Sequence, residues 1–178
     1  PMTIDYPMAS IRFHKFAIEG MKDIQKQTEK SKAFYFPYVE ERKGVADNLL
    51  IELAKNAAVV ITDDYPTYFV PQMTADAKGS IQTTYELVDS NGLLPIRIAD
   101  KEYVRAHDFR RFMHKNIEDF LVEVPEANPL EYLNLKFEEK ILEPIFNKYE
   151  LIDFKNVNVQ DFLDNLNAVS YTHLTLPT

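Results

Sequence analysis

The feature that most constrains the fold of this chain is an unbroken apolar run that ends abruptly in acidic residues. Residues 57–66 read AAVVITDDYP, and the polar side chains begin where a strand would end. An apolar run without alternation is typical of a strand buried on both faces of a parallel sheet. Ligands of open α/β sheets bind beyond the carboxyl ends of the strands, so the first candidate binding residues are Thr62, Asp63, Asp64 and Tyr65. The alternative is that the two aspartates only solubilise and cap the turn before Pro66.

A second polar cluster follows the next predicted strand. Residues 81–88, IQTTYELV, are rich in β-branched and aromatic side chains, and a turn over 89–92 comes directly after them. If the two strands are neighbours, the side chains of Asp89 and Asn91 face the same crevice as residues 62–65. The sequence therefore predicts one binding crevice built from two strand ends.

Apolar periodicity predicts the elements that surround these strands. It indicates helices over 10–30, 44–56, 72–78 and 101–122, and an additional strand over 33–38. Ser10 is placed to cap the first helix, and the side chains that we expect on its buried face are Phe13, Phe16, Ala17, Met21 and Ile24. The strand over 33–38, the helix over 44–56 and the run from 57 would form a βαβ unit, which closes right-handed almost without exception.

The predicted helix over 101–122 is basic, although the chain carries a net charge of −8. Its expected apolar face comprises Tyr103, Ala106, Phe109, Met113, Ile117 and Phe120. The candidate contacts to DNA or to a neighbouring domain are Arg105, Arg110 and Arg111. A solvated or inter-domain face is the alternative, because the acidic chain as a whole lacks the basic surface that nucleic-acid-binding proteins usually show.

The chain is expected to change character at the proline-rich break over 125–129. Residues 130–149 and 159–166 look helical, and the Glu143-Pro144 step kinks or divides the first of these. The fold class that we predict is α/β, with a Rossmann-like parallel sheet and flanking helices, followed by the start of an all-helical domain.

The predicted domains follow from this break. They are an α/β domain over 1–124, which lacks its first strand because a helix opens the chain, and the first helices of a truncated domain over 125–168. Residues 169–178, VSYTHLTLPT, look like a translated sequencing adapter and are excluded from the fold prediction.

Composition narrows the classes of function. The chain has no cysteine, four glycines and four histidines without a metal-ligand spacing, so we expect neither a metal site nor a glycine-rich phosphate loop. No apolar run approaches the roughly 20 residues that cross a bilayer, and no leader opens the chain. These observations predict a cytoplasmic monomer without a membrane partner.

Three motifs in order carry a resemblance to a known family. VVITDDYP, then YELVDSNGLLPIR, then YVRAHDFRRFMHKNI with EVPEANPL behind it, resemble the N-terminal half of DNA photolyases, closest to the class II deoxyribodipyrimidine photolyases. The matching positions are Thr62, Asp63, Val88, Asp89, Asn91, Leu93 to Pro95, and Phe109 to Arg111. Asp64 and Tyr65 depart from the commoner Phe-Ser of the family. The resemblance covers about residues 11–130.

The resemblance implies a light-dependent DNA repair lyase. Such flavoproteins pair an α/β domain, which in some members holds an antenna pigment, with a helical domain that holds FAD and the flipped-out pyrimidine dimer. Light-excited, reduced FAD donates the electron that splits the dimer. FAD and damaged DNA would thus be bound in the full-length parent, beyond residue 168, and no catalytic residue is assigned to this chain, which we expect to be inactive alone. An antenna pigment would lie over the strand-end residues.

Two other functions remain open at this point. A cryptochrome-type photoreceptor shares the same fold without repairing DNA, and the residues that would separate it from a repair enzyme belong to the missing half. An unrelated α/β module that binds a nucleotide through the same crevice is the other alternative.

Overall fold

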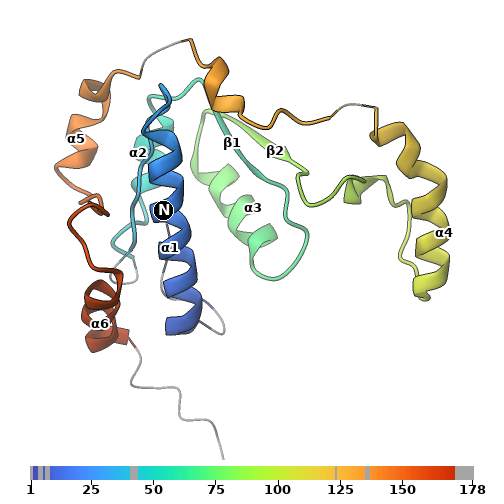
Figure 1. Ribbon diagram of the computed structural model, residues 1–178, viewed down its shortest axis with the longest axis horizontal. Coiled ribbons are helices and arrows are strands. Elements are labelled where there is room, and N and C mark those ends of the chain that lie inside the picture. Colours follow the sequence, from blue (N-terminus) through green and yellow to red (C-terminus); the bar gives the residue numbers. More distant parts are fainter. Residues whose placement is uncertain are drawn as a thin grey trace, which may run out of the picture. The chain divides into compact units, whose positions relative to one another are not determined.

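The computed structural model describes residues 2–3, 6, 9–40, 44–122, 124–134 and 137–170, with side chains as far as Asn165 (Figure 1). The chain divides into two compact units. Unit 1 comprises residues 1–53 and 128–178, and unit 2 comprises residues 54–127. Within the described residues, no helix is both long enough and apolar enough to cross a membrane.

Unit 2 contains a parallel strand pair joined by a helix. Strand β1 (Val59–Asp63) leads into α3 (Val70–Ser80) and then into β2 (Thr84–Val88), and the register runs from Val59 opposite Thr84 to Asp63 opposite Val88 (Figure 1). This arrangement of mixed helix and parallel strand agrees with the α/β class in its coarse form. Both strands lie where the sequence predicts them, although each begins two or three residues later.

The βαβ unit is a different one from that predicted over 33–62. Residues 33–38 form no strand, and Val39 makes only an isolated parallel bridge with Met2. Pro37, which has no N–H to donate, interrupts the run, and its carbonyl accepts from the N–H of Ile152 at 2.9 Å. The aromatic run is therefore fixed by scattered contacts within unit 1 and not by a sheet.

The expectation that β1 is buried on both faces is wrong. Its side chains alternate between exposed and half-buried, and Ile61 is 59% exposed. In the register of the pair, Val60 and Thr62 share a face with Tyr85 and Leu87, and this face is directed toward α3. The sheet has two strands in the described part of unit 2, so its other face stays open although Val59 and Ile61 on it are apolar.

The basic segment of unit 2 is shorter than the helix predicted over 101–122. After a 3₁₀ turn, η1 (Ile96–Ile98), helix α4 spans Ala106–Asn116 and tightens into the 3₁₀ turn η2 (Ile117–Phe120). Arg105 precedes the helix in an extended conformation. The expected apolar face is not buried; instead the rings of Tyr103, Phe109 and Phe112 pack on one another, with centroids 5.2 to 6.2 Å apart.

Unit 1 begins with α1 (Ile11–Thr28), and its predicted cap is confirmed. The Ser10 hydroxyl accepts from the N–H of Phe13 at 3.4 Å. The predicted buried face is wrong at Phe13 and Phe16, which are 56% and 79% exposed, whereas Met21 does pack against a core. The fully buried side chains of the helix are His14 and Ile18. The reason is packing against α6 (Val159–Ser170), which contacts a neighbouring arc of the helix.

Two small cores hold unit 1 together. The first joins Ile18 of α1 to Leu163 of α6, with Val39, Ile152 and Phe154 between them. The second surrounds Leu49 of α2 (Leu49–Ala54) and includes Tyr38, Leu142, Ile145 and Tyr149. The Lys155 ammonium lies 3.0 Å from the carboxylate of Glu29, just beyond α1.

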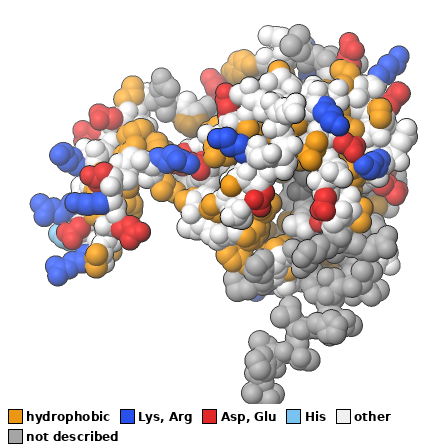
Figure 2. Space-filling model, turned by 180° about the vertical axis from the view of Figure 1, so that it is seen from behind, with side chains coloured by type: hydrophobic (Ala, Val, Ile, Leu, Met, Phe, Trp, Pro, Cys, Tyr) orange, Lys and Arg blue, Asp and Glu red, His pale blue; other side chains and the backbone are white. Residues whose placement is uncertain are grey.

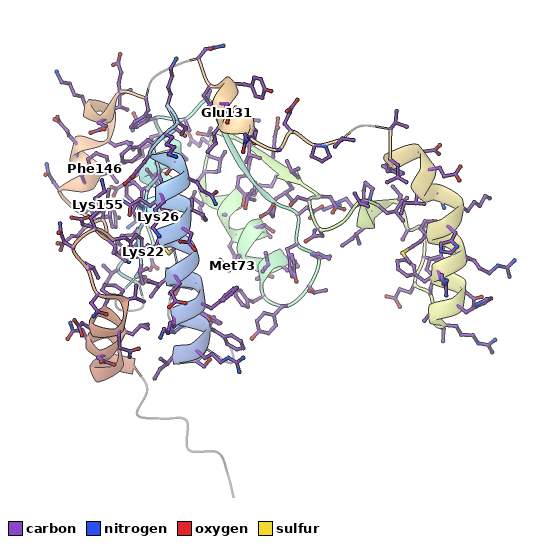
Figure 3. The ribbon with its side chains drawn as sticks, in the orientation of Figure 1. Lys22, Lys26, Met73, Glu131, Phe146 and Lys155 are labelled. Carbon is purple, nitrogen blue, oxygen red and sulfur yellow. The ribbon has the colours of Figure 1, made fainter. Side chains whose placement is uncertain are left out.

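The helical segment predicted over 130–149 is divided at Glu143-Pro144, as the sequence indicated, but it is helical only in short pieces. Its described residues form η3 (Pro129–Tyr132), η4 (Glu139–Leu142) and α5 (Glu143–Phe146). Pro144 lies in the first turn of α5, where a missing N–H costs nothing, so a new helix starts there. The ring of Phe146, labelled in Figure 3, packs on Phe34 with centroids 5.5 Å apart. The helix predicted over 159–166 is confirmed as α6.

Candidate functional site

The carboxyl ends of β1 and β2 lie side by side in unit 2. The N–H of Asp64 donates to the carbonyl of Val88 at 2.8 Å, which extends the ladder by one bond. Beyond it, the Ser90 hydroxyl donates to the Asp63 carboxylate at 2.6 Å, and the Asn91 side-chain amide donates to the Asp64 carbonyl at 2.7 Å. The parallel register thus brings together the two polar clusters that the sequence placed at strand ends.

A pocket of about 520 Å³ opens beside these strand ends, within unit 2. The side chains of Tyr85 and Leu87 from β2 face Thr74, Ala75 and Lys78 from α3 across it. The segment after β1 contributes Asp64, Tyr65 and Pro66, α3 adds Pro71, and the loop after β2 adds Asp89, Ile96 and Arg97. A volume of this size is in the range of small-molecule and cofactor sites.

Half of the predicted strand-end residues line this pocket. Asp64, Tyr65 and Asp89 do so, whereas Asp63 and Asn91 hold the two loops together and Thr62 lies within the strand pair, opposite Leu87. Their role in binding stays a prediction. The alternative, that Asp63 only stabilises the turn, agrees with the hydrogen bond that its carboxylate accepts from the Ser90 hydroxyl.

Sequence reasoning missed four pocket residues that carry polar groups, Thr74, Lys78, Tyr85 and Arg97. Arg97 lies nine residues beyond β2 and is brought back by the loop. Lys78 lies in the last turn of α3, and Tyr85 belongs to the face of β2 that the strand pattern alone did not orient. The available signal for Tyr85 was the alternation of side chains along a strand. It puts Tyr85 and Leu87 on the same face as Asp89, which the sequence did nominate.

An ion pair fixes the mouth of the pocket. The Arg97 guanidinium donates through Nε to Asp64, whose side chain is only 15% exposed. This hydrogen bond holds the pKa of Asp64 below its usual value and, together with the charge of Asp64, raises the pKa of Arg97. Both groups therefore stay charged across the neutral range.

Asp89 is held by the loop that follows it. Desolvation acts to raise the pKa of Asp89, but hydrogen bonds outweigh it and lower the pKa, the largest from the Asn91 side chain and the next from the Ile96 N–H, which lies 2.6 Å from the carboxylate. The carboxylates of Asp64 and Asp89 are therefore both ionised and both accept hydrogen bonds within the protein. Their chemistry is that of positioning groups and not of proton donors.

The remaining polar groups suit an anionic or planar ligand. Burial raises the pKa of Tyr85, so its phenol stays neutral, and Lys78 forms no ion pair with a described residue. Two tyrosine rings, two prolines, Leu87, Ile96 and Ala75 supply the apolar surface. The site could hold a flat aromatic ring system against Tyr85 with an acidic substituent near Lys78.

The three predicted arginine contacts lie apart from this pocket. Arg105, Arg110 and Arg111 are exposed, and none of them lines it. Among the described residues, no three histidine, aspartate or glutamate side chains come together as metal ligands.

Comparison with curated proteins finds one distant relative. The chain is 28% identical over 144 residues to the deoxyribodipyrimidine photo-lyase of Methanothermobacter thermautotrophicus, a match that covers 80% of this chain and 30% of the relative. The chain thus spans less than a third of that protein's length. No family model matches the chain, and no solved structure matches it. The similarity supports a relation to the photolyase family and agrees with the three motifs.

Proposed function

We propose that the parent protein of this chain is a light-dependent DNA photolyase, a flavoprotein lyase that splits cyclobutane pyrimidine dimers. The observation that carries the proposal is the similarity to a deoxyribodipyrimidine photo-lyase over 80% of the chain. It gains support from the two strand ends, because motif positions that are far apart in the sequence lie at one edge of one sheet.

The described residues would serve the reaction by placement. In the parent, reduced FAD would supply the electron that opens the dimer. Unit 2 would hold its strand-end loops rigid through the bonds of Asp64, Asp89 and Asn91, and would carry an antenna pigment in the pocket. The hydrogen bonds that fix Asp64 and Asp89 agree with a role in placement, because binding a pigment requires fixed contacts and no proton transfer.

The pocket meets the requirements of an antenna pigment in size and lining. Its volume of about 520 Å³ accommodates a tricyclic ring system, and the Tyr85 ring and Leu87 offer an apolar wall. Lys78 and the exposed guanidinium of Arg97 lie where an anionic substituent would gain two cations.

The test of the function is dimer repair by the product of the full gene. We expect the purified protein, with its flavin reduced, to restore thymine pairs in a dimer-containing oligonucleotide under blue light and not in the dark. A light-responsive flavoprotein that leaves the dimer intact would support the photoreceptor alternative and overturn the proposal. A protein without flavin would favour the nucleotide-binding alternative.

The pigment site has a separate test in the 178-residue chain. Flavin mononucleotide is a suitable fluorescent probe, since it combines a planar tricyclic ring with a phosphate. We expect its fluorescence anisotropy to rise on addition of the chain, and Tyr85→Ala to weaken binding about tenfold, through loss of stacking and apolar contact. Tyr132→Ala, which removes a 65% exposed ring from unit 1, should change nothing. Equal loss in both variants would contradict the assignment.

A further inference from the structure

We infer that the basic face of α4 is a docking surface for the phosphate backbone of DNA, distinct from the pocket at the strand ends. The identity of the partner rests on the proposed function, while the surface itself follows from the structure. The inference does not depend on Arg105, which lies before the helix.

The basic face is defined by the spacing of its residues along α4. His107, Arg110, Arg111, His114 and Lys115 follow one another at i, i+3, i+4, i+7 and i+8, which puts all of them on one side of an α-helix. All five side chains are exposed. Figure 2 shows several Lys and Arg side chains on the segment that carries α4, with Asp and Glu side chains among them.

The cations of this face are not neutralised within the protein. Arg110, Arg111 and Lys115 form no ion pair with any described residue, in contrast to Arg97 and Lys148, whose carboxylate partners are close. The acidic side chains nearby are Glu102 and Asp108, which line one pocket together with Arg111, and Glu118 and Asp119 in η2, which limit the face at its C-terminal end. Three permanent positive charges thus remain available to a polyanion.

The dimensions of the basic face match one strand of DNA. Residues 107 to 115 cover about 12 Å of helix at 1.5 Å per residue. Phosphates of one strand follow each other about every 3.4 Å along the duplex axis, so the face spans about three of them. Because the chain as a whole is acidic, with a net charge of −8, binding must be local, weak and strongly dependent on salt.

The opposite side of α4 disfavours a membrane as the partner. A helix that lies on a lipid surface presents an open apolar face. Phe112 and Met113 are half-buried, and the rings of Phe109 and Phe112 pack on Tyr103, over which the Lys101 ammonium lies 5.5 Å from the ring centroid. These ring contacts cover part of the apolar side within unit 2, while Phe109 stays 39% exposed.

The experiment compares two charge-matched triple variants of the 178-residue chain. One removes the cations of the basic face, as Arg110→Gln, Arg111→Gln and Lys115→Gln. The other removes three exposed cations of unit 1, as Arg12→Gln, Lys15→Gln and Lys30→Gln, for the same change in net charge. Circular dichroism checks that both fold. The readout is the anisotropy of a fluorescent, undamaged 20-base-pair duplex between 20 and 200 mM salt.

We expect the basic-face variant to lose at least about tenfold in affinity at 50 mM salt and to reduce the slope of log affinity against log salt by about 2.7, or about 0.9 per phosphate contact. The unit 1 variant should keep the slope of the unmodified chain. Equal losses in both variants, or no loss in either, would overturn the inference. Binding of anionic phospholipid vesicles through the same three residues, without a change in duplex binding, would overturn it as well.

This outcome is separable from that of the proposed function. A parent protein that fails to repair dimers but binds duplex through Arg110, Arg111 and Lys115 would retain the docking surface and lose the photolyase assignment. A parent that repairs dimers, and whose basic-face variant binds undamaged duplex normally, would retain the assignment and lose the docking surface.

Discussion

The ion pair between Arg97 and Asp64 joins two loops that are 33 residues apart in the sequence. Neither residue is distinguished by its neighbours, and the sequence nominated Asp64 for its place at a strand end while passing over Arg97. A long-range pair of this kind cannot be predicted from local pattern, because the loop after β2 has no periodicity that fixes where its ninth residue lies.

Acid should weaken unit 2 through this pair. The pKa of Asp64 is lowered in the folded protein, so its contribution to stability is present above the unfolded value of 3.8 and is lost as the pH falls through the lower folded value. We expect the gap in urea unfolding free energy between the unmodified chain and Asp64→Asn to be constant from pH 7 to 5 and to close below pH 4. In Arg97→Gln, the same Asp64→Asn change should have a smaller effect. A gap that does not change with pH would contradict this account.

The stability of unit 1 should also depend on pH, through the buried side chain of His14. Its side chain is fully buried, its ring contacts Tyr6 edge-on at 5.4 Å, and burial lowers the pKa of His14 below 6.5. The unfolded state therefore binds the proton more readily, so stability is present above pH 6.5 and falls as the pH drops from 6.5 toward the folded pKa.

Replacement of His14 tests this linkage. We expect His14→Leu to remove part of the decrease in unfolding free energy between pH 7 and 5, as measured by urea titration at each pH. The exposed His107→Leu should leave the decrease unchanged. A His14→Leu chain with the full decrease would show that other groups carry it.

At the scale of helices and strands, the sequence predicted correctly those features that depend on residues close together in the chain. The Ser10 cap, the strand ends at Asp63 and Val88, and helix α6 all depend on neighbouring residues, and the structure has them. The strand predicted over 33–38 failed because pairing partners come from elsewhere in the chain, and Pro37 removes a donor.

The buried face of α1 shows the same limit. Phe13, Phe16 and Ile24 form the more apolar stripe, but His14 and Ile18 are buried instead, and Ile18 packs in the core that includes Leu163 of α6. Periodicity identifies a helix and its amphipathic spacing, whereas the arc that is buried depends on which element packs there.

Two alanine substitutions distinguish the predicted face from the observed one. Ile18→Ala should lower the unfolding free energy by about 2 to 5 kcal/mol, since it opens a cavity in the core shared with Leu163. Phe16→Ala should change it by no more than about 0.5 kcal/mol, because the ring is 79% exposed. Urea unfolding of both variants gives the comparison, and a larger loss for Phe16→Ala would reverse the assignment of the buried face.

At the scale of the whole molecule, the chain leaves unit 1 after Leu53 and returns to it at Asn128. The return lies within the proline-rich stretch over 125–129, which the sequence marks as a break. The exit has no such mark, because α2 is separated from β1 only by residues 55–58, with neither proline nor glycine among them. Composition therefore indicated one boundary of unit 2 and gave no sign of the other.

The uncovered face of the β1–β2 pair has a practical consequence for anyone who produces this chain. Val59, Ile61 and Val88 lie on that face at 39%, 59% and 48% exposure, next to strand edges that can pair with another copy. Overproduction in bacteria should send much of the material into inclusion bodies, and Ile61→Lys should move it into the supernatant, whereas Val104→Lys, at an isolated and almost fully exposed position, should not. Gel quantification of the two fractions would decide, and its result would set how the chain has to be handled at the bench.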